Sequence, residues 1–210
     1  MNPVITINTQ SSIRIESAEA VIRFDPFKIT GEPHDADLIL ITHDHYDHFS
    51  PEDIRKVSKP AALLIAPKCM EKALAKHGFS NHMLMSPAEE ETILGIRVEA
   101  VASYNILKPF HPKSNGNLGY VITAGGKRIY VAGDTDAVKE AKAVRSDIAL
   151  VPIGGTYTMN AKDAAALINT IKPQIAIPTH YGSIVGRLSD GEMFRSLVND
   201  EIETRLLLTE

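Results

Sequence analysis

Residues 43–48 read His-Asp-His-Tyr-Asp-His, which places three histidines and two aspartates within six positions. Such a concentration is unusual in a chain of 210 residues with eight histidines. In an extended segment, side chains two positions apart share one side, so His43 and His45 can bind one cation. Asp47 and His48 would then turn toward a second cation. Because three clustered histidines repel one another when protonated, this segment predicts a metal site rather than a solvated loop.

The neighbouring sequence predicts that residues 43–48 lie on a turn between a strand and a helix. Residues 38–41, Leu-Ile-Leu-Ile, form a short apolar run that is typical of a buried strand. Ser50, Pro51 and Asp53 provide the N-cap, the first-turn proline and the acidic third position of a helix. Open α/β sheets bind ligands at the carboxyl ends of their strands, which is where this segment is expected to lie.

Two further apolar runs end in a residue that can bind a metal. Asp134 follows Gly133 after the run 128–132, and His180 follows the run 175–177. Each signal is weak alone, because an aspartate after a strand is usually a turn or cap and a lone histidine is usually structural. Three such strand ends in one chain indicate that the residues share a site.

Elements of both kinds alternate along the chain, with no low-complexity segment. Strands are expected over residues 4–7, 12–15, 20–24, 38–42, 61–66, 82–85, 91–101, 118–123, 128–132, 148–151, 174–178 and 203–208. Helices are expected over residues 51–57, 68–77, 137–144, 161–171 and 190–199. This order predicts two sheets covered by helices.

The motifs together resemble those of the metallo-β-lactamase superfamily. Residues 42–48 match its His-x-His-x-Asp-His signature, and residues 133–135 and 178–182 follow in the expected order. The chain looks closest to the small single-domain branch that includes the ascorbate-6-phosphate lactonase-like proteins. The resemblance implies an α/β (α+β) fold, a four-layer αβ/βα sandwich of two mixed sheets flanked by helices, formed by one domain over residues 1–210.

The resemblance also implies a dinuclear site at one edge of the sandwich and a role for each ligand. His43 and His45 would hold the first ion, Asp47, His48 and His180 the second, and Asp134 would bridge the two.

One position departs from the family pattern. The family usually adds a histidine to the first ion in mid-chain, where this sequence has Asn105. Either His111, six residues later, reaches the site as ligand or proton donor, or the first ion is weakly held. Asp25, in the turn at residues 25–26, is a candidate for supporting a ligand from behind.

The ligand types predict hydrolysis. Two divalent ions outweigh the charges of ionised Asp47 and Asp134, and the remaining positive charge favours an anionic transition state. Ions roughly 3.5–4 Å apart can generate a nucleophile and bind the developing oxyanion. Metal binding lowers the pKa of water to about 7, and Asp47 could orient that water or accept its proton. We therefore expect a metal-bound hydroxide to cleave an ester, lactone or phosphodiester, with two zinc ions favoured over manganese or iron.

Two loops are expected to contact the substrate. Asn105, Lys108 and Lys113 belong to the first, and the two lysines could bind the phosphate or carboxylate of a small anionic substrate. The alternative is that both lysines are solvated. Tyr157, in the second loop, and Tyr181 are candidates for hydrogen bonding to a leaving group.

Three other functions use parts of the same pattern. An iron-containing oxidoreductase has similar ligands. A metal-poor binding module would result if Asn105, in place of a histidine, left the first ion unbound. A nuclease is disfavoured, because the chain has no room for an inserted clamp domain, its net charge is −4 and its pI is near 6.1.

Composition predicts a cytoplasmic protein that acts on a small molecule. An apolar fraction of 44 % suffices for a core, and no segment is long and apolar enough to span a membrane. The first ten residues lack a basic and then apolar leader, and the single Cys69 suits a reducing compartment. Pairing of apolar sheet edges would allow a homo-oligomer.

Overall fold

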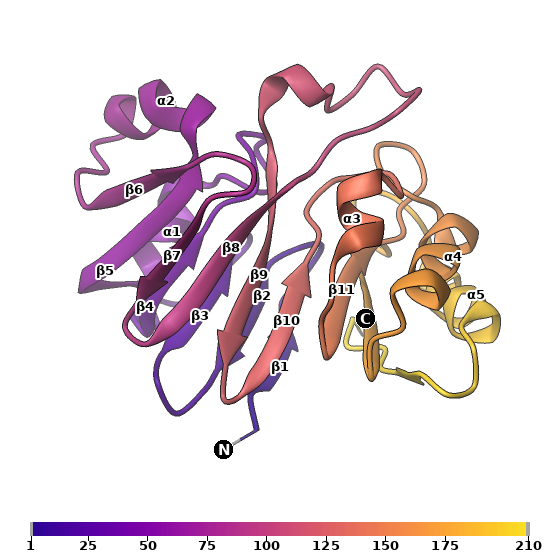
Figure 1. The fold of residues 1–210 in the computed structure, drawn as a ribbon. Helices are drawn as coiled ribbons and strands as arrows, with labels where there is room; N and C mark the ends of the chain where they lie inside the picture. Colours follow the sequence, from indigo (N-terminus) through magenta and orange to yellow (C-terminus); the bar gives the residue numbers. More distant parts are fainter. Residues whose placement is uncertain (1, 209–210) are drawn as a thin grey trace.

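Two sheets packed face to face form the centre of the structure (Figure 1), a computed structural model that describes residues 2–208. The first sheet has the order β1 (Val4–Ile7), β2 (Ile13–Glu16), β3 (Val21–Phe24), β4 (Ala36–Leu40), β5 (Ser58–Pro67) and β6 (His82–Met85). The second has the order β13 (Glu203–Thr204), β12 (Ile175–Thr179), β11 (Ile148–Pro152), β10 (Lys127–Val131), β9 (Leu118–Ala124), β8 (Ile96–Ala102) and β7 (Glu90–Ile93).

Three apolar clusters hold the layers together. The largest lies between the sheets, where Ile22 and Leu40 of the first sheet share a cluster with Val98 and Ile122 of the second. Each of these strands alternates buried and outward side chains or is buried on both faces, as a sandwich requires. This central cluster fixes how the two sheets face each other.

Helices cover both outer faces of the sandwich. The outer face of the first sheet packs against α1 (Pro51–Val57) and α2 (Glu71–Lys76), which follows a short 3-10 turn, η1 (Lys68–Met70). The outer face of the second sheet packs against α3 (Lys139–Ala143), α4 (Ala161–Ile171) and α5 (Ser189–Leu197). Figure 1 shows these helices on opposite sides of the sheets, so the four-layer αβ/βα sandwich is confirmed.

The strand directions bring the functional segments to one edge. In the first sheet β3 and β4 are parallel, and in the second β10, β11 and β12 are parallel. The antiparallel strand β9 separates β8 from β10, so these two strands also run the same way. The carboxyl ends of strands in each set therefore meet at one edge, where the loops that follow them gather.

Local capping chemistry explains why two helices were predicted with the observed bounds. The Ser50 side chain accepts a hydrogen bond from the Asp53 amide, and Pro51 begins the helix. Asn160 accepts in the same way from the amide of Asp163 and begins α4. These contacts are made within four residues, so they can be read from the sequence.

Three of the expected elements differ from the structure by more than a few residues at their ends, or in kind. The expected strand over 91–101 is a hairpin, because Leu94 and Gly95 adopt left-handed backbone angles between β7 and β8. The expected helix over 68–77 begins as the 3-10 turn η1, and the last strand is limited to Glu203–Thr204 rather than 203–208. Within residues 2–208, no helix is long and apolar enough to cross a membrane.

Candidate metal centre

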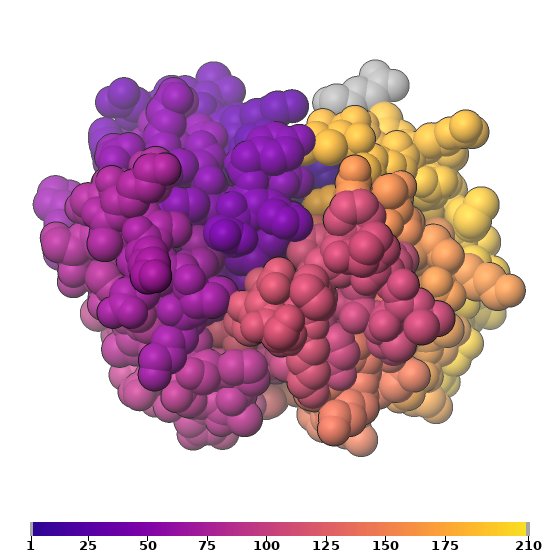
Figure 2. Space-filling view, turned by 90° about the horizontal axis from the view of Figure 1, so that it is seen from above, coloured from indigo at the N-terminus to yellow at the C-terminus, as the bar shows by residue number. Residues whose placement is uncertain are grey.

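Six potential ligands, together with His111, gather at one edge of the sandwich. Residues 43–48 follow β4, whereas Asp134 and His180 follow β10 and β12. His111 comes from the loop between β8 and β9. Figure 2 looks down on this edge, with the N-terminal half on one side, the C-terminal half on the other and the loop between β8 and β9 in front. Both sheets therefore contribute to the site.

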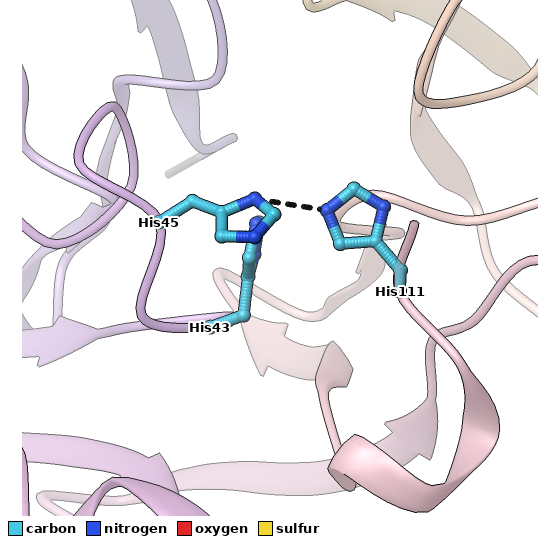
Figure 3. A group of neighbouring side chains, drawn as sticks. All are labelled: His43, His45 and His111. Carbon is cyan, nitrogen blue, oxygen red and sulfur yellow. Dashed lines mark hydrogen bonds between the residues drawn. The ribbon is translucent and has the colours of Figure 1, made fainter. Parts of the chain in front are cut away.

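The first group of ligand atoms consists of His43, His45 and His111, all within 4.8 Å of one another. His111 Nε2 lies 3.0 Å from His45 Nδ1, and Figure 3 shows the two rings facing each other from opposite loops. His111 therefore lies where the family pattern would bring the histidine that Asn105 replaces, and the first group has three histidines.

The second group consists of Asp47, His48 and His180, and Asp134 forms a third with His43 of the first group and His48 of the second. Asp134 Oδ1 is 3.4 Å from His48 Nε2, while its Oδ2 is 3.4 Å from His180 Nε2 and 3.6 Å from His111 Nε2. His180 Nε2 is also 3.4 Å from Asp47 Oδ2. Asp134 thus faces histidines of the first and the second group.

Several of these atoms are buried without a hydrogen-bond partner among the described residues. They are His43 Nε2, His48 Nε2, His180 Nε2 and Asp134 Oδ1. Burying unpaired polar atoms is costly, so such convergence indicates a missing partner. Tetrahedral ligands 2.0–2.1 Å from an ion lie roughly 3.3–3.4 Å from each other, close to the separations around Asp134. The residues present therefore fit divalent metal ions.

Asn105 and the Tyr157 carbonyl hold His111 in place. Asn105 Nδ2 donates to the carbonyls of Phe110, at 2.9 Å, and Tyr157, at 2.8 Å. His111 Nδ1 is 3.3 Å from the same Tyr157 carbonyl, and since a carbonyl only accepts, Nδ1 carries the proton. This leaves Nε2 unprotonated in neutral His111, with its lone pair facing the site. Burial lowers the pKa of His111, which favours that neutral form.

Asp25 and Thr42 orient two ligands from behind. Asp25 is fully buried, and its carboxylate accepts hydrogen bonds from the Thr42 amide (2.8 Å), the Thr42 hydroxyl (2.7 Å) and His48 Nδ1 (2.7 Å). Since the hydroxyl proton is committed to Asp25, Thr42 Oγ1 accepts from His43 Nδ1 at 3.0 Å. Both imidazoles are thereby fixed with Nε2 toward the site.

Substituting Asp25 with asparagine is expected to lower metal affinity about 10- to 100-fold. Asparagine tolerates the left-handed backbone of this position, where φ is +42°, but its neutral amide cannot replace the acceptor for all three donors. Titration of metal-free protein with zinc against a competing chelator measures the change. Asp37→Asn, which removes an acid bonded to Lys59 away from the site, should leave the affinity unchanged.

Charge in the buried site differs from one histidine to the next. Burial and the neighbouring histidines lower the pKa of His43 well below its usual value, so it is neutral. Burial also opposes charge on His48, but the carboxylates of Asp134, Asp25 and Asp47 outweigh it and raise the pKa of His48 to about 9. Burial would raise the pKa of Asp47, but the close approach of His180, 3.4 Å away, and the charge of His48 lower it to about 2.

The metal-free protein is expected to lose stability as the pH rises from 6.5 to above 9. Since folding raises the pKa of His48 from 6.5 to about 9, its contribution is complete below 6.5 and is lost through 9. The low pKa of Asp47 acts only in acid, where its contribution is lost as the pH falls through about 2. Urea unfolding of chelator-treated protein at several pH values tests this, and His48→Gln should flatten the alkaline decline.

The turn between β1 and β2 positions His180. Gln10 is fully buried in a left-handed conformation (φ +49°), and its carbonyl accepts the His180 amide at 3.0 Å. Gly154 passes so close that a Cβ there would lie 2.5 Å from the His180 carbonyl oxygen. Only glycine fits this contact. The strands predicted over residues 4–7 and 12–15 place a connection here, but the sequence gave no signal that it contacts a ligand.

A cavity of about 320 Å³ opens in front of the ligands. Its lining residues are His45, Tyr46, Asp47, Phe110, Asp134, Tyr157, His180 and Ile184. Tyr157 was predicted to contact substrate, whereas Tyr46, Phe110 and Ile184 were missed. Tyr46 and Phe110 flank predicted ligands in the sequence, which is a usable signal, but nothing in the sequence singles out Ile184.

Four residues predicted to contact substrate do not line this cavity: Asn105, Lys108, Lys113 and Tyr181. Lys108 is tied to Asp136 by an ion pair and lines a separate hollow against α4. Tyr181 is buried, and its ring packs against Gly191 of α5. Asn105 is also buried, and its Nδ2 donates to the backbone carbonyls of Phe110 and Tyr157.

Comparisons with known proteins place this geometry in a family. The beta-lactamase superfamily domain matches residues 4–180. A UPF0173 metal-dependent hydrolase from Thermoplasma acidophilum is 37 % identical over 82 % of this chain and 81 % of its own. Another from Thermococcus onnurineus is 33 % identical over 89 % of this chain and 88 % of its own.

A solved structure agrees with these relatives. It comes from Parabacteroides distasonis, carries the provisional name metal-dependent hydrolase, and superimposes with a TM-score of 0.82 at 30 % identity. The match covers 99 % of this chain and 94 % of that one. The chain therefore belongs to the metallo-β-lactamase superfamily and is one of its metal-dependent hydrolases.

Proposed function

We propose that the protein uses two divalent metal ions, zinc by preference, to hydrolyse an ester, lactone or phosphodiester bond of a small molecule. This proposal rests on four buried atoms that converge without a hydrogen-bond partner. They belong to His43, His48, His180 and Asp134. Histidine nitrogens and carboxylate oxygens suit zinc, and the three histidines of the first group favour it over magnesium or calcium.

Ions bound there would supply positive charge and make water acidic enough to act as a nucleophile near neutral pH. Asp47 lines the cavity, and its low pKa keeps it ionised, so it can orient an attacking water by accepting a hydrogen bond. The Tyr157 side chain also lines the cavity, where its hydroxyl can donate to a leaving group.

The volume of the cavity favours a small substrate. Its volume of about 320 Å³ lies at the lower end of ligand pockets, which span roughly 300–1,000 Å³. This supports a substrate that enters whole rather than a polymer that crosses the surface, and agrees with the chain's acidic balance.

Removing metal is expected to abolish hydrolysis and to lower the melting temperature. Each ion at about 100 times its dissociation constant stabilises a folded protein by roughly 2.7 kcal/mol, which corresponds to roughly 5–11 °C per ion for a chain of this size. Elemental analysis should give two ions per chain after zinc reconstitution. Parallel reconstitution with manganese and iron then ranks the metals by activity on esters, lactones and phosphodiesters.

Circular dichroism of the chelated protein provides the control, because the fold must persist for the comparison to concern chemistry. Hydrolysis that continues at full rate in protein with no residual metal would refute the proposed function. Stoichiometry that stays at one ion with excess zinc would refute the dinuclear part alone.

A further inference from the structure

The walls of the cavity differ in chemistry from its floor. The floor consists of the ligands His45, Asp47, Asp134 and His180. The remaining lining residues, Tyr46, Phe110, Tyr157 and Ile184, are aromatic or aliphatic. Any part of a substrate that extends beyond the reacting bond must therefore lie against these four side chains.

These wall residues expose apolar surface that core packing does not explain. Tyr46 is 66 % exposed, Phe110 41 % and Ile184 38 %. Exposed apolar side chains that gather around a concave site mark a binding surface. Aromatic contacts hold the walls in place: Phe110 meets Tyr157 edge to face with ring centroids 4.6 Å apart, and Tyr46 meets Phe27 at 5.9 Å. The walls are thus partly fixed before any ligand enters.

The lining of this cavity, as far as the structure describes it, includes no lysine or arginine. The two lysines of the neighbouring loop are committed elsewhere, since Lys108 pairs with Asp136 and Lys113 with Glu140, the latter at 2.7 Å. A second charged group on the substrate would lose its hydration at these walls without gaining a partner. The expectation of a substrate held by loop lysines is therefore not supported.

We propose that the part of the substrate that does not react is an uncharged aromatic or compact apolar group, bound between Tyr46, Phe110 and Tyr157. This inference rests on the proposed hydrolytic function for the reacting bond, but concerns only the group beside it. A flat ring can stack against the edges and faces of the three aromatic side chains. Ile184 adds a purely apolar surface to the lining. The cavity volume limits this group to about the size of a single ring with a short chain.

Binding of two amides that resist hydrolysis tests the inference directly. N-benzylacetamide is neutral and aromatic, whereas N-acetyltaurine is anionic and its sulfonate coordinates metals only weakly. Ligand-observed NMR on zinc-loaded protein should give a dissociation constant at least tenfold lower for N-benzylacetamide. Equal or tighter binding of N-acetyltaurine would overturn the inference.

Substitutions locate the binding surface. Phe110→Ala should weaken N-benzylacetamide at least fivefold and leave N-acetyltaurine unchanged. Leu107→Ala is the matched control, since Leu107 is 94 % exposed on the same loop and lies outside the cavity. If Phe110→Ala loses metal through the neighbouring His111, Tyr46→Ser replaces it as the test. Unchanged binding in a metal-loaded variant of either residue would overturn the inference.

Hydrolysis of a lactone pair separates this inference from the proposed function. We expect γ-phenyl-γ-butyrolactone to be cleaved with a kcat/KM at least tenfold above that of γ-carboxy-γ-butyrolactone, mainly through a lower KM. Faster cleavage of the carboxylated lactone would overturn the inference and leave the hydrolase intact. The protein could instead bind N-benzylacetamide more tightly than N-acetyltaurine but cleave no ester, lactone or phosphodiester. That result would support an apolar binding surface and refute the proposed hydrolysis of these bonds.

Discussion

Replacing Asp134 with asparagine is expected to lower kcat/KM by about three orders of magnitude or more and to reduce metal content to one ion or fewer. Asparagine keeps the shape of the side chain but removes the charge that faces His48, His180 and His111 at 3.4–3.6 Å. Because Asp134 is only 3 % exposed, solvent cannot supply the missing charge. Elemental analysis and steady-state kinetics on the same preparations measure both effects.

Asp44→Asn is the matched control. Asp44 belongs to the same six-residue segment as the ligands but is exposed and lies outside every group of metal-ligand atoms found among the described residues. Its variant should keep two ions and most of its activity. Full activity in Asp134→Asn, or equal losses in both variants, would contradict the bridging role of Asp134.

Substituting His111 with alanine is expected to remove the first ion, so that stoichiometry falls from two ions per chain to one. His111 supplies the third nitrogen of the first group, and His43 and His45 alone leave that ion with few protein ligands. We expect activity to fall roughly 100-fold or more, since one ion can no longer share the two tasks of a dinuclear site. The metal content per chain shows whether His111 is needed for the first ion, whatever substrate is used.

Two further variants help to interpret the metal content of His111→Ala. His34→Ala removes a histidine in an exposed turn far from the ligands and should retain both ions. Asn105→Ala should keep the ligands but loosen them, with a loss of affinity of about 10- to 100-fold that excess zinc restores. Two tightly bound ions in His111→Ala would show that Asn105, rather than His111, completes the first group.

That the candidate ligands lie together could be predicted from the sequence because their signal is local. His43, His45, Asp47 and His48 lie within six positions, and Asp134 and His180 each lie within three residues of the end of an apolar run. Once strand directions are known, the carboxyl ends meet without further information. The helix bounds at residues 51–57 were predicted for the same reason, since an N-cap acts over one turn.

The loop that carries His111 could not be predicted in this way. Its path depends on the left-handed backbone of His111 (φ +52°) and on the bond from Asn105 to Tyr157, 52 residues away. The side chain of Lys108 was assigned to substrate because its partner Asp136, 28 residues away, could not be identified from sequence. Long-range contacts of this kind decide which side chains are free to meet a ligand.

The division of the ligands between the two sheets has a consequence for the lifetime of the folded chain. His43, His45, Asp47 and His48 extend from the first sheet, and His111, Asp134 and His180 from the second, so the ions we propose would join the layers at their open edge. Separating the sheets would then require breaking coordination bonds as well as the apolar core. Metal occupancy should thus slow the rate of unfolding, and in a cell the loss of metal would expose the chain to proteases before it changed the fold.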